Sequence, residues 1–124
     1  DLAGQLCEAL SKNVSGIVAV TDRDTVISVA GGAKRELLEK RISVALEKIL
    51  EDRGLYQSRE GGEGVSVTEG NEKYRVYLAA PILSQGDVMG CVLFITDAAD
   101  KTAGETERAL AETAASFLGR HMEN

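Results

Sequence analysis

Apolar positions follow a helical spacing in three separate stretches of this 124-residue chain. Residues 2–14, 42–53 and 102–122 repeat apolar side chains every three or four positions, which predicts three amphipathic helices. Ser43 is the expected N-cap of the middle helix, and Thr102 with Glu105 predicts a capping box at the start of the last one. Helices are therefore expected at both ends of the chain and in its middle.

Between these helices, short runs rich in β-branched residues alternate with turn signals. Residues 16–30 contain two such runs on either side of Asp22-Arg23-Asp24, which predicts a hairpin whose turn is supported by the Asp side chains. Further strands are predicted at 64–68, 73–83 and 87–96. The polar, glycine-rich stretch before them, residues 54–64, is the expected mobile loop.

The last two strands differ in how their side chains divide between the two faces. In the strand over 73–83, two-residue alternation predicts that Tyr74, Val76 and Leu78 share one face and that Arg75, Tyr77 and Ala79 share the other. Residues 88–95 are apolar in both phases, so this strand should be central and covered on both sides. Gly90 interrupts it, which indicates a bulge or a point of close packing.

Two features near the first hairpin have both a chemical and a structural interpretation. Asp22 and Asp24 could form a catalytic or metal-binding pair, but turns use such residues routinely and no third ligand is adjacent. Gly31-Gly32 could present backbone N–H groups to an anion at a helix start. Because the full phosphate-loop spacing is absent, a glycine turn that leaves the strand is the favoured interpretation.

The other candidate groups are three glutamates and two cysteines. Glu60, Glu63 and Glu69 could be offered as a metal site, but glutamates without a nearby histidine or aspartate are more typical of a solvated surface. Cys7 and Cys91 lie far apart, each within an apolar pattern and outside any metal or redox spacing. We expect both thiols to be reduced and buried, and we expect neither a metal nor a cofactor.

Composition and charge narrow the function further. The chain has 20 acidic and 14 basic residues and a formal net charge of −6, so it should repel phosphate backbones and anionic lipids. No apolar run approaches the roughly 20 residues of a membrane span. We expect one cytoplasmic domain over residues 1–124, and the initial Asp1 suggests that an upstream part is missing.

The predicted order is helix, two strands, helix, mobile loop, three strands and helix. This order predicts an α+β fold with an antiparallel sheet, the terminal helices on one face and the middle helix with its loops on the other. The stretch PILSQGDVMGCVLFI, residues 81–95, resembles the closing hairpin of GAF domains. Together with GIVAVTDRDTVISVAGGAKRELLEKRIS and ETERALAETAASFLGRHME, it is similar to the C-terminal, GAF-like domain of the stage V sporulation protein T family.

The resemblance implies a function in transcription regulation of spore-forming bacteria. In that family a DNA-binding domain of the AbrB type precedes the GAF-like domain, so DNA contact would belong to an absent N-terminal part. This chain would then be a regulatory and oligomerisation domain that senses a small molecule; a purely structural dimerisation module without a ligand is the alternative. An enzyme is not expected, because neither cysteine has the electropositive setting of a reactive thiol.

The same reasoning predicts a binding site and an assembly surface. A pocket would lie under the middle helix and the loops at 31–41 and 54–64, with Ser28, Arg75 and Tyr77 as polar contacts. The apolar stripes of the terminal helices exceed what one sheet face covers, which predicts a homodimer or homotetramer through these helices. The residues expected at that interface are Leu6, Leu10, Leu110, Ala111, Ala114, Ala115 and Leu118.

Overall fold

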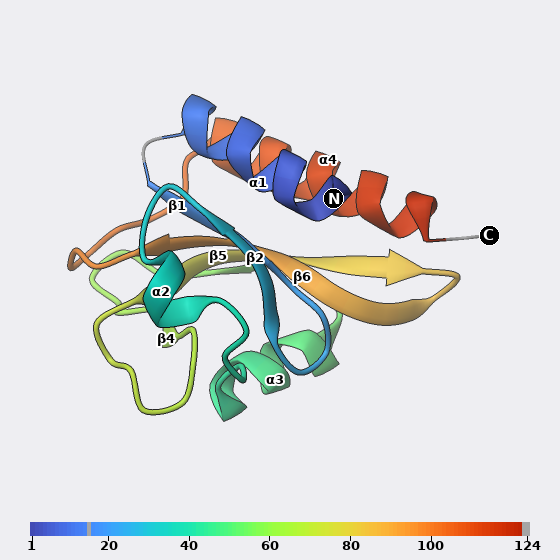
Figure 1. The fold of residues 1–124 in the computed structure, drawn as a ribbon. Coiled ribbons are helices and arrows are strands. Elements are labelled where there is room, and N and C mark those ends of the chain that lie inside the picture. Colours follow the sequence, from blue (N-terminus) through green and yellow to red (C-terminus); the bar gives the residue numbers. More distant parts are fainter. Residues whose placement is uncertain (15, 123–124) are drawn as a thin grey trace.

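An antiparallel sheet organises the fold (Figure 1). The structure is a computed structural model that describes residues 1–14 and 16–122. Within these residues the sheet has six strands: five follow the order β2-β1-β6-β5-β3, and the sixth, β4, pairs with β5. The strands are β1 (Ile17–Thr21), β2 (Val26–Ala30), β3 (Tyr56–Gln57), β4 (Val65–Ser66), β5 (Arg75–Ser84) and β6 (Asp87–Thr96). The helices are α1 (Leu2–Asn13), α2 (Lys34–Leu37), α3 (Val44–Asp52) and α4 (Glu105–His121).

Helices cover both faces of the sheet. α1 and α4 lie side by side across one face, while α2 and α3 lie against the other (Figure 1). The two chain ends lie at the same end of the α1–α4 layer, because these helices run in opposite directions (Figure 1). This arrangement confirms the predicted α+β class, with terminal helices on one face and the middle helix on the other.

Local hydrogen bonds explain where the first hairpin and the middle helix begin and end. Asp22 Oδ1 accepts from the backbone N–H groups of Asp24 at 2.8 Å and Thr25 at 2.7 Å, which confirms the Asp-supported turn. Ser43 Oγ accepts from the Leu46 N–H at 3.0 Å, so Ser43 caps α3 as predicted. Backbone N–H groups in the β1–β2 turn and at the start of α3 therefore donate to side chains.

The last helix begins three residues later than the sequence predicts. Thr102 and Glu105 do not form the expected capping box, because α4 starts at Glu105 with Gly104 as its N-cap. The Glu107 carboxylate instead accepts from the Gly104 N–H at 2.8 Å. A glutamate therefore caps the helix as predicted, but it is Glu107 and not Glu105.

A β-bulge in β5 changes which face its side chains occupy. Val76 pairs with Ile95 and Leu78 pairs with Phe94, so Tyr77 is an extra residue between them. Tyr77 and Leu78 both pack beneath α1 and α4, and Ala79 packs toward α3. The predicted alternation is therefore wrong from Leu78 onward, because a bulge adds one residue to one strand and inverts the phase.

Strand β6 is the centre of the sheet, between β1 and β5. Phe94 and Val92 are fully buried toward α1 and α4, and Leu93 and Cys91 are fully buried toward α3. Gly90 lies at a register shift against β5, and a methyl group there would collide with the backbone of Thr21. Central position, two-sided burial and close packing at Gly90 are all as predicted.

Small residues let α4 approach the sheet closely. Ala111, Ala114 and Ala115 are buried on the inner side of α4, and Gly119 continues this side in the last turn. A Cβ at Gly119 would collide with the carbonyl oxygen of Leu83 on β5. The distance between α4 and β5 is therefore set by residues with little or no side chain.

Replacing Gly119 with Ala should lower the free energy of unfolding by about 1–3 kcal/mol, because overpacking forces the helix or the strand to move. Gly4→Ala is the matched control, since Gly4 also lies in a helix and its new methyl would meet only the side chain of Asp1. The control should be neutral or stabilising by up to about 1 kcal/mol through helix propensity. Urea unfolding of both variants measures the difference, and a stabilised Gly119→Ala protein would contradict this packing.

Candidate functional site

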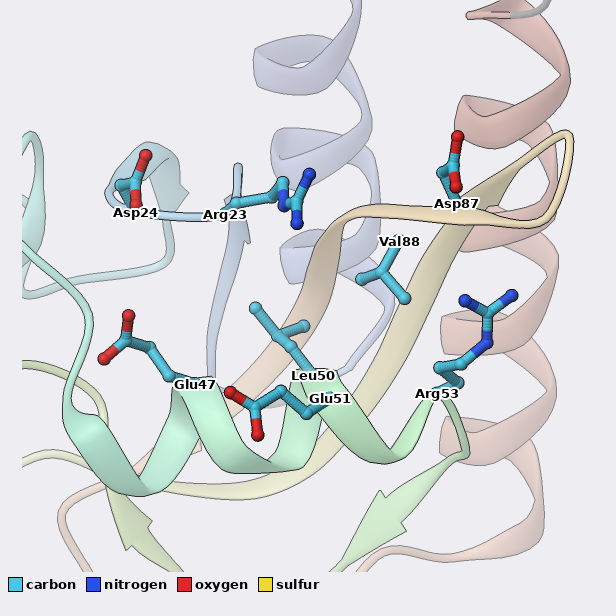
Figure 2. A pocket seen from close by; sticks show the side chains of 8 residues that line it. All are labelled: Arg23, Asp24, Glu47, Leu50, Glu51, Arg53, Asp87 and Val88. Atoms are coloured by element: carbon cyan, nitrogen blue, oxygen red, sulfur yellow. The ribbon is translucent and has the colours of Figure 1, made fainter.

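A groove at one end of the sheet brings together three segments that are distant in the sequence (Figure 2). We call it the end groove; its volume is about 370 Å³. It is formed by the β1–β2 turn, the C-terminal half of α3 and the start of β6. Its lining residues are Arg23, Asp24, Glu47, Leu50, Glu51, Arg53, Asp87 and Val88.

Tight backbone turns fix the walls of the end groove. Arg53 ends α3 in the left-handed region, with φ of 63°, a conformation that is uncommon for a residue other than glycine. Its guanidinium Nη2 donates to the carbonyl oxygen of Gly86 in the β5–β6 turn. Gln85 and Gly86 both have positive φ, as a two-residue hairpin turn requires. Arg53 therefore connects the end of α3 to the tip of this hairpin.

The charges of the end groove lie around an apolar floor. Leu50 is buried and Val88 half-buried, and both lie between the charged side chains. Figure 2 shows Glu47 and Glu51 on α3, and Arg23 and Arg53 on either side of Val88. The lining holds four carboxylates and two guanidiniums, so it suits a small polar molecule. Its lining contains no thiol, hydroxyl or imidazole, so carboxylates are the groups there that could take up a proton.

The predicted contact residue Arg75 is engaged in holding the glycine-rich loop. Its Nε donates to the Glu63 carbonyl at 3.0 Å and its Nη2 to the Gly64 carbonyl at 3.0 Å. Its Nη1 forms an ion pair with Glu72 at 2.7 Å and donates to Ser66 Oγ at 3.3 Å. Because each guanidinium nitrogen already has a protein acceptor, Arg75 is a structural clamp for this loop.

Tyr77, the second predicted contact, connects β5 to the start of α4. Its hydroxyl donates to Glu107 Oε2 at 2.6 Å, and the Lys101 ammonium lies 5.5 Å from its ring centroid. Burial, the hydrogen bond to Glu107 and the charge of Glu107 together raise the pKa of Tyr77 well above its ordinary value. Tyr77 therefore remains protonated and donates this hydrogen bond across the physiological range.

The structure brings Arg75 and Tyr77 together but places Ser28 elsewhere. Arg75 and Tyr77 both line a cavity of about 200 Å³ beside the glycine-rich loop. Ser28 lies on the edge strand β2, separated from β5 by β1 and β6, and lines a different cavity beside α1. The three residues therefore do not form one site, and none of them lines the end groove.

Most residues predicted for an interface between copies are covered by the chain's own sheet. Leu10, Ala111, Ala114, Ala115 and Leu118 are at most 8% exposed and pack against strands β1, β5 and β6. Leu6 and Leu110 are half-buried. Phe117, which the prediction omitted, is 50% exposed and stacks on His121 with ring centroids 6.5 Å apart. The residues exposed on the outer side of α1 and α4 are thus not the same as those predicted for the interface.

Both thiols are inaccessible. Cys7 in α1 and Cys91 in β6 are fully buried and not disulfide-bonded, as predicted. Burial raises the pKa of each thiol to about 12; Glu8 adds to this at Cys7, and a contact with Thr21 Oγ1 at 3.2 Å partly offsets it at Cys91. Neither thiol has the lowered pKa of a reactive cysteine.

Metal sites and membrane-spanning helices are absent from residues 1–14 and 16–122. No three His, Cys, Asp or Glu side chains converge in a way that could hold a metal ion there. In the same part of the chain, the helices are too short or too polar to cross a bilayer.

Solved structures with the same architecture identify the class of fold. The cofactor-binding GAF domain of the nutrient sensor CodY from Clostridium difficile has a TM-score of 0.68 and 16% identity, covering 96% of this chain and 83% of that chain. A type II free methionine-R-sulfoxide reductase from Thermoplasma acidophilum has a TM-score of 0.71 and 10% identity, covering 97% and 94%. The fold is that of a GAF domain, which here a nutrient sensor and an enzyme share.

Sequence comparison identifies the family. The model of the stage V sporulation protein T C-terminal family, described as a transcription factor, matches residues 1–123. Stage V sporulation protein T of Bacillus subtilis (strain 168) is 34% identical over 123 residues, which cover 99% of this chain and 68% of that protein. The chain belongs to the stage V sporulation protein T C-terminal family of transcription factors.

We predict that both thiols resist modification in the folded protein. At pH 8 a thiol reagent such as DTNB should label Cys7 and Cys91 only as fast as the protein opens, because both thiols are buried and protonated. Labelling in denaturant should be complete and fast, which provides the control. Rapid stoichiometric labelling of either cysteine in the native state would contradict the burial and the raised pKa.

Proposed function

We propose that this chain is the regulatory and oligomerisation domain of a sporulation transcription factor, acting in the cytoplasm of a spore-forming bacterium. Its membership of the family supports a role in transcription. Its acidic charge supports a division of labour in which a separate basic domain contacts DNA. The buried, protonated thiols support a non-catalytic role for this chain.

The observation that carries the oligomerisation proposal is the outer surface of the α1–α4 layer. Phe117 and Met122 are each 50% exposed, and Leu6 and Leu110 are only half-buried. Exposed large apolar side chains on adjoining helices are typical of a surface that another protein chain covers. A second copy is the simplest cover, because a two-fold axis pairs one such patch with itself.

A helix layer shared by two copies would also explain how regulation reaches DNA. The first residues of α1 lie in this layer, so upstream DNA-binding domains in a dimer would be held at a separation set by the helix packing. A molecule that shifts α1 or α4 would then change that separation. The end groove is the site we propose for such a molecule, because the start of β6 lines it and α4 packs on β5 and β6 from the other face.

The alternative is a structural dimerisation module without a ligand. One observation favours it: the space between the sheet and α3 is filled by the chain's own side chains. Leu37, Ile42, Leu46, Val67, Val76 and Leu93 are fully buried there. Under this alternative, the α1–α4 layer would serve only to pair two copies.

Phe117→Glu should weaken the dimer, because it places a charge where an apolar surface is to be covered. Ala45→Glu is the matched control, since Ala45 is an exposed small apolar residue on α3, on the other face of the sheet. Sedimentation velocity at tens of micromolar should show a wild-type dimer, a weakened Phe117→Glu dimer and a smaller effect of the control. A wild-type domain that sediments as a monomer at these concentrations would end the oligomerisation proposal.

A ligand that binds only the folded domain should raise its stability by roughly 2.7 kcal/mol at a hundredfold excess over Kd. A thermal-shift screen of metabolites measures this increase. Arg23→Gln with Glu51→Gln should abolish the shift, whereas Arg35→Gln with Glu60→Gln, outside the groove, should leave it unchanged. No shift with any compound would favour the module without a ligand.

A further inference from the structure

A second groove shares Arg53 with the end groove, but the rest of its lining has a different chemistry. It lies between α4 and strand β5, and its volume is about 430 Å³, within the range of small-molecule sites. We call it the helix-side groove. Its lining residues are Arg53, Leu55, Ala80, Pro81, Leu83, Glu112, Ala115, Ser116 and Arg120.

The floor of the helix-side groove is apolar and partly open. Ala80 and Ala115 are buried, whereas Leu55 and Pro81 are half-buried. Leu83 is 39% exposed, which is unusual for a large apolar side chain on a strand of the main sheet. Gly119, which has no side chain, lets α4 approach the backbone of Leu83 closely. Such a floor favours a hydrocarbon group.

The rim of the helix-side groove is cationic although the chain is acidic. Two guanidiniums, those of Arg53 and Arg120, face one carboxylate, that of Glu112. The end groove has the reverse balance, with four carboxylates and two guanidiniums. In a chain of net charge −6, this groove therefore offers a local attraction for an anion. Guanidinium groups suit carboxylates in particular, because they donate two parallel hydrogen bonds.

Arg53 is placed here at a conformational cost. It occupies the left-handed C-cap position of α3, where glycine is the favoured residue. Its Nη2 donates to the Gly86 carbonyl, which fixes the direction of the guanidinium. The guanidinium of Arg53 is therefore held in one direction at the edge of the groove.

We propose that the helix-side groove binds a small amphipathic carboxylate, with its hydrocarbon part on Leu55, Pro81 and Leu83 and its carboxylate at Arg53 and Arg120. The volume suits a short or branched chain and not a long fatty acid. The site shares Arg53 and no other lining residue with the end groove, and it does not depend on a second copy. An acid bound there would contact α4 directly, on the side of the helix that faces β5.

The test is an NMR titration of the folded domain with hexanoate as the probe. Saturable shifts are expected at Leu55, Leu83 and Ala115, with weaker or absent shifts for hexanamide and hexylamine. Inorganic phosphate, which lacks an apolar part, should bind more weakly than hexanoate. The same titration of Phe117→Glu should give the same Kd, which separates this proposal from the dimer.

Two substitutions test whether the carboxylate of hexanoate binds at Arg53 and Arg120. Arg53→Gly keeps the left-handed position favourable and removes the guanidinium, and Arg120→Gln removes the other one. Each should weaken hexanoate binding about tenfold, the effect of losing one charge-assisted hydrogen bond. Arg35→Gln removes an exposed arginine on α2, outside this groove, and should leave Kd unchanged.

Any of these titration results would overturn the proposal: no saturable binding, equal binding of hexanamide, equal weakening by Arg35→Gln, or shifts confined to the end groove. Ser116→Leu provides a check that does not alter charge, because a larger side chain on α4 should obstruct the groove. Unchanged hexanoate affinity in that variant would place the acid elsewhere and contradict the proposal.

Discussion

The burial of β6 on both faces is the constraint on which the rest of the structure depends. Phe94 and Val92 on one face and Leu93 and Cys91 on the other are all removed from water. A sheet whose central strand is apolar on both sides needs a cover on each side. The terminal helices supply one cover and α3 with its flanking loops supplies the other, so the three-layer architecture follows from this one strand.

The two covers meet the sheet in different ways. On the α3 side, large aliphatic residues such as Leu46 and Ile42 fill the space. On the other side, α4 presents alanines and Gly119 to the sheet, and its larger residue Phe117 is directed outward. The small residues of α4 therefore pack closely on the sheet, and its large apolar residue lies on the outer surface. The outer surface is the one that we propose a second copy covers.

The sequence predicted the parts of the fold that depend on local patterns. Helical spacing located the three main helices, and the Asx turn and the Ser43 cap follow from residue type alone. The faces of Leu78 and Ala79 could not be predicted, because the Tyr77 bulge depends on pairing with β6. Ser28 was grouped with Arg75 because strand order is not visible in the sequence. The end groove was missed because its walls join only in the folded chain, although the sequence Arg53-Gly54 after a helix signals a special C-cap.

The central claim is that the α1–α4 layer packs on the sheet with one side and on a second copy with the other. The dependence of thermal unfolding on protein concentration tests it directly. If the folded state is a dimer, Tm must rise between about 1 and 100 µM, because association stabilises the folded form by mass action. A Tm that is unchanged across this range would contradict the account.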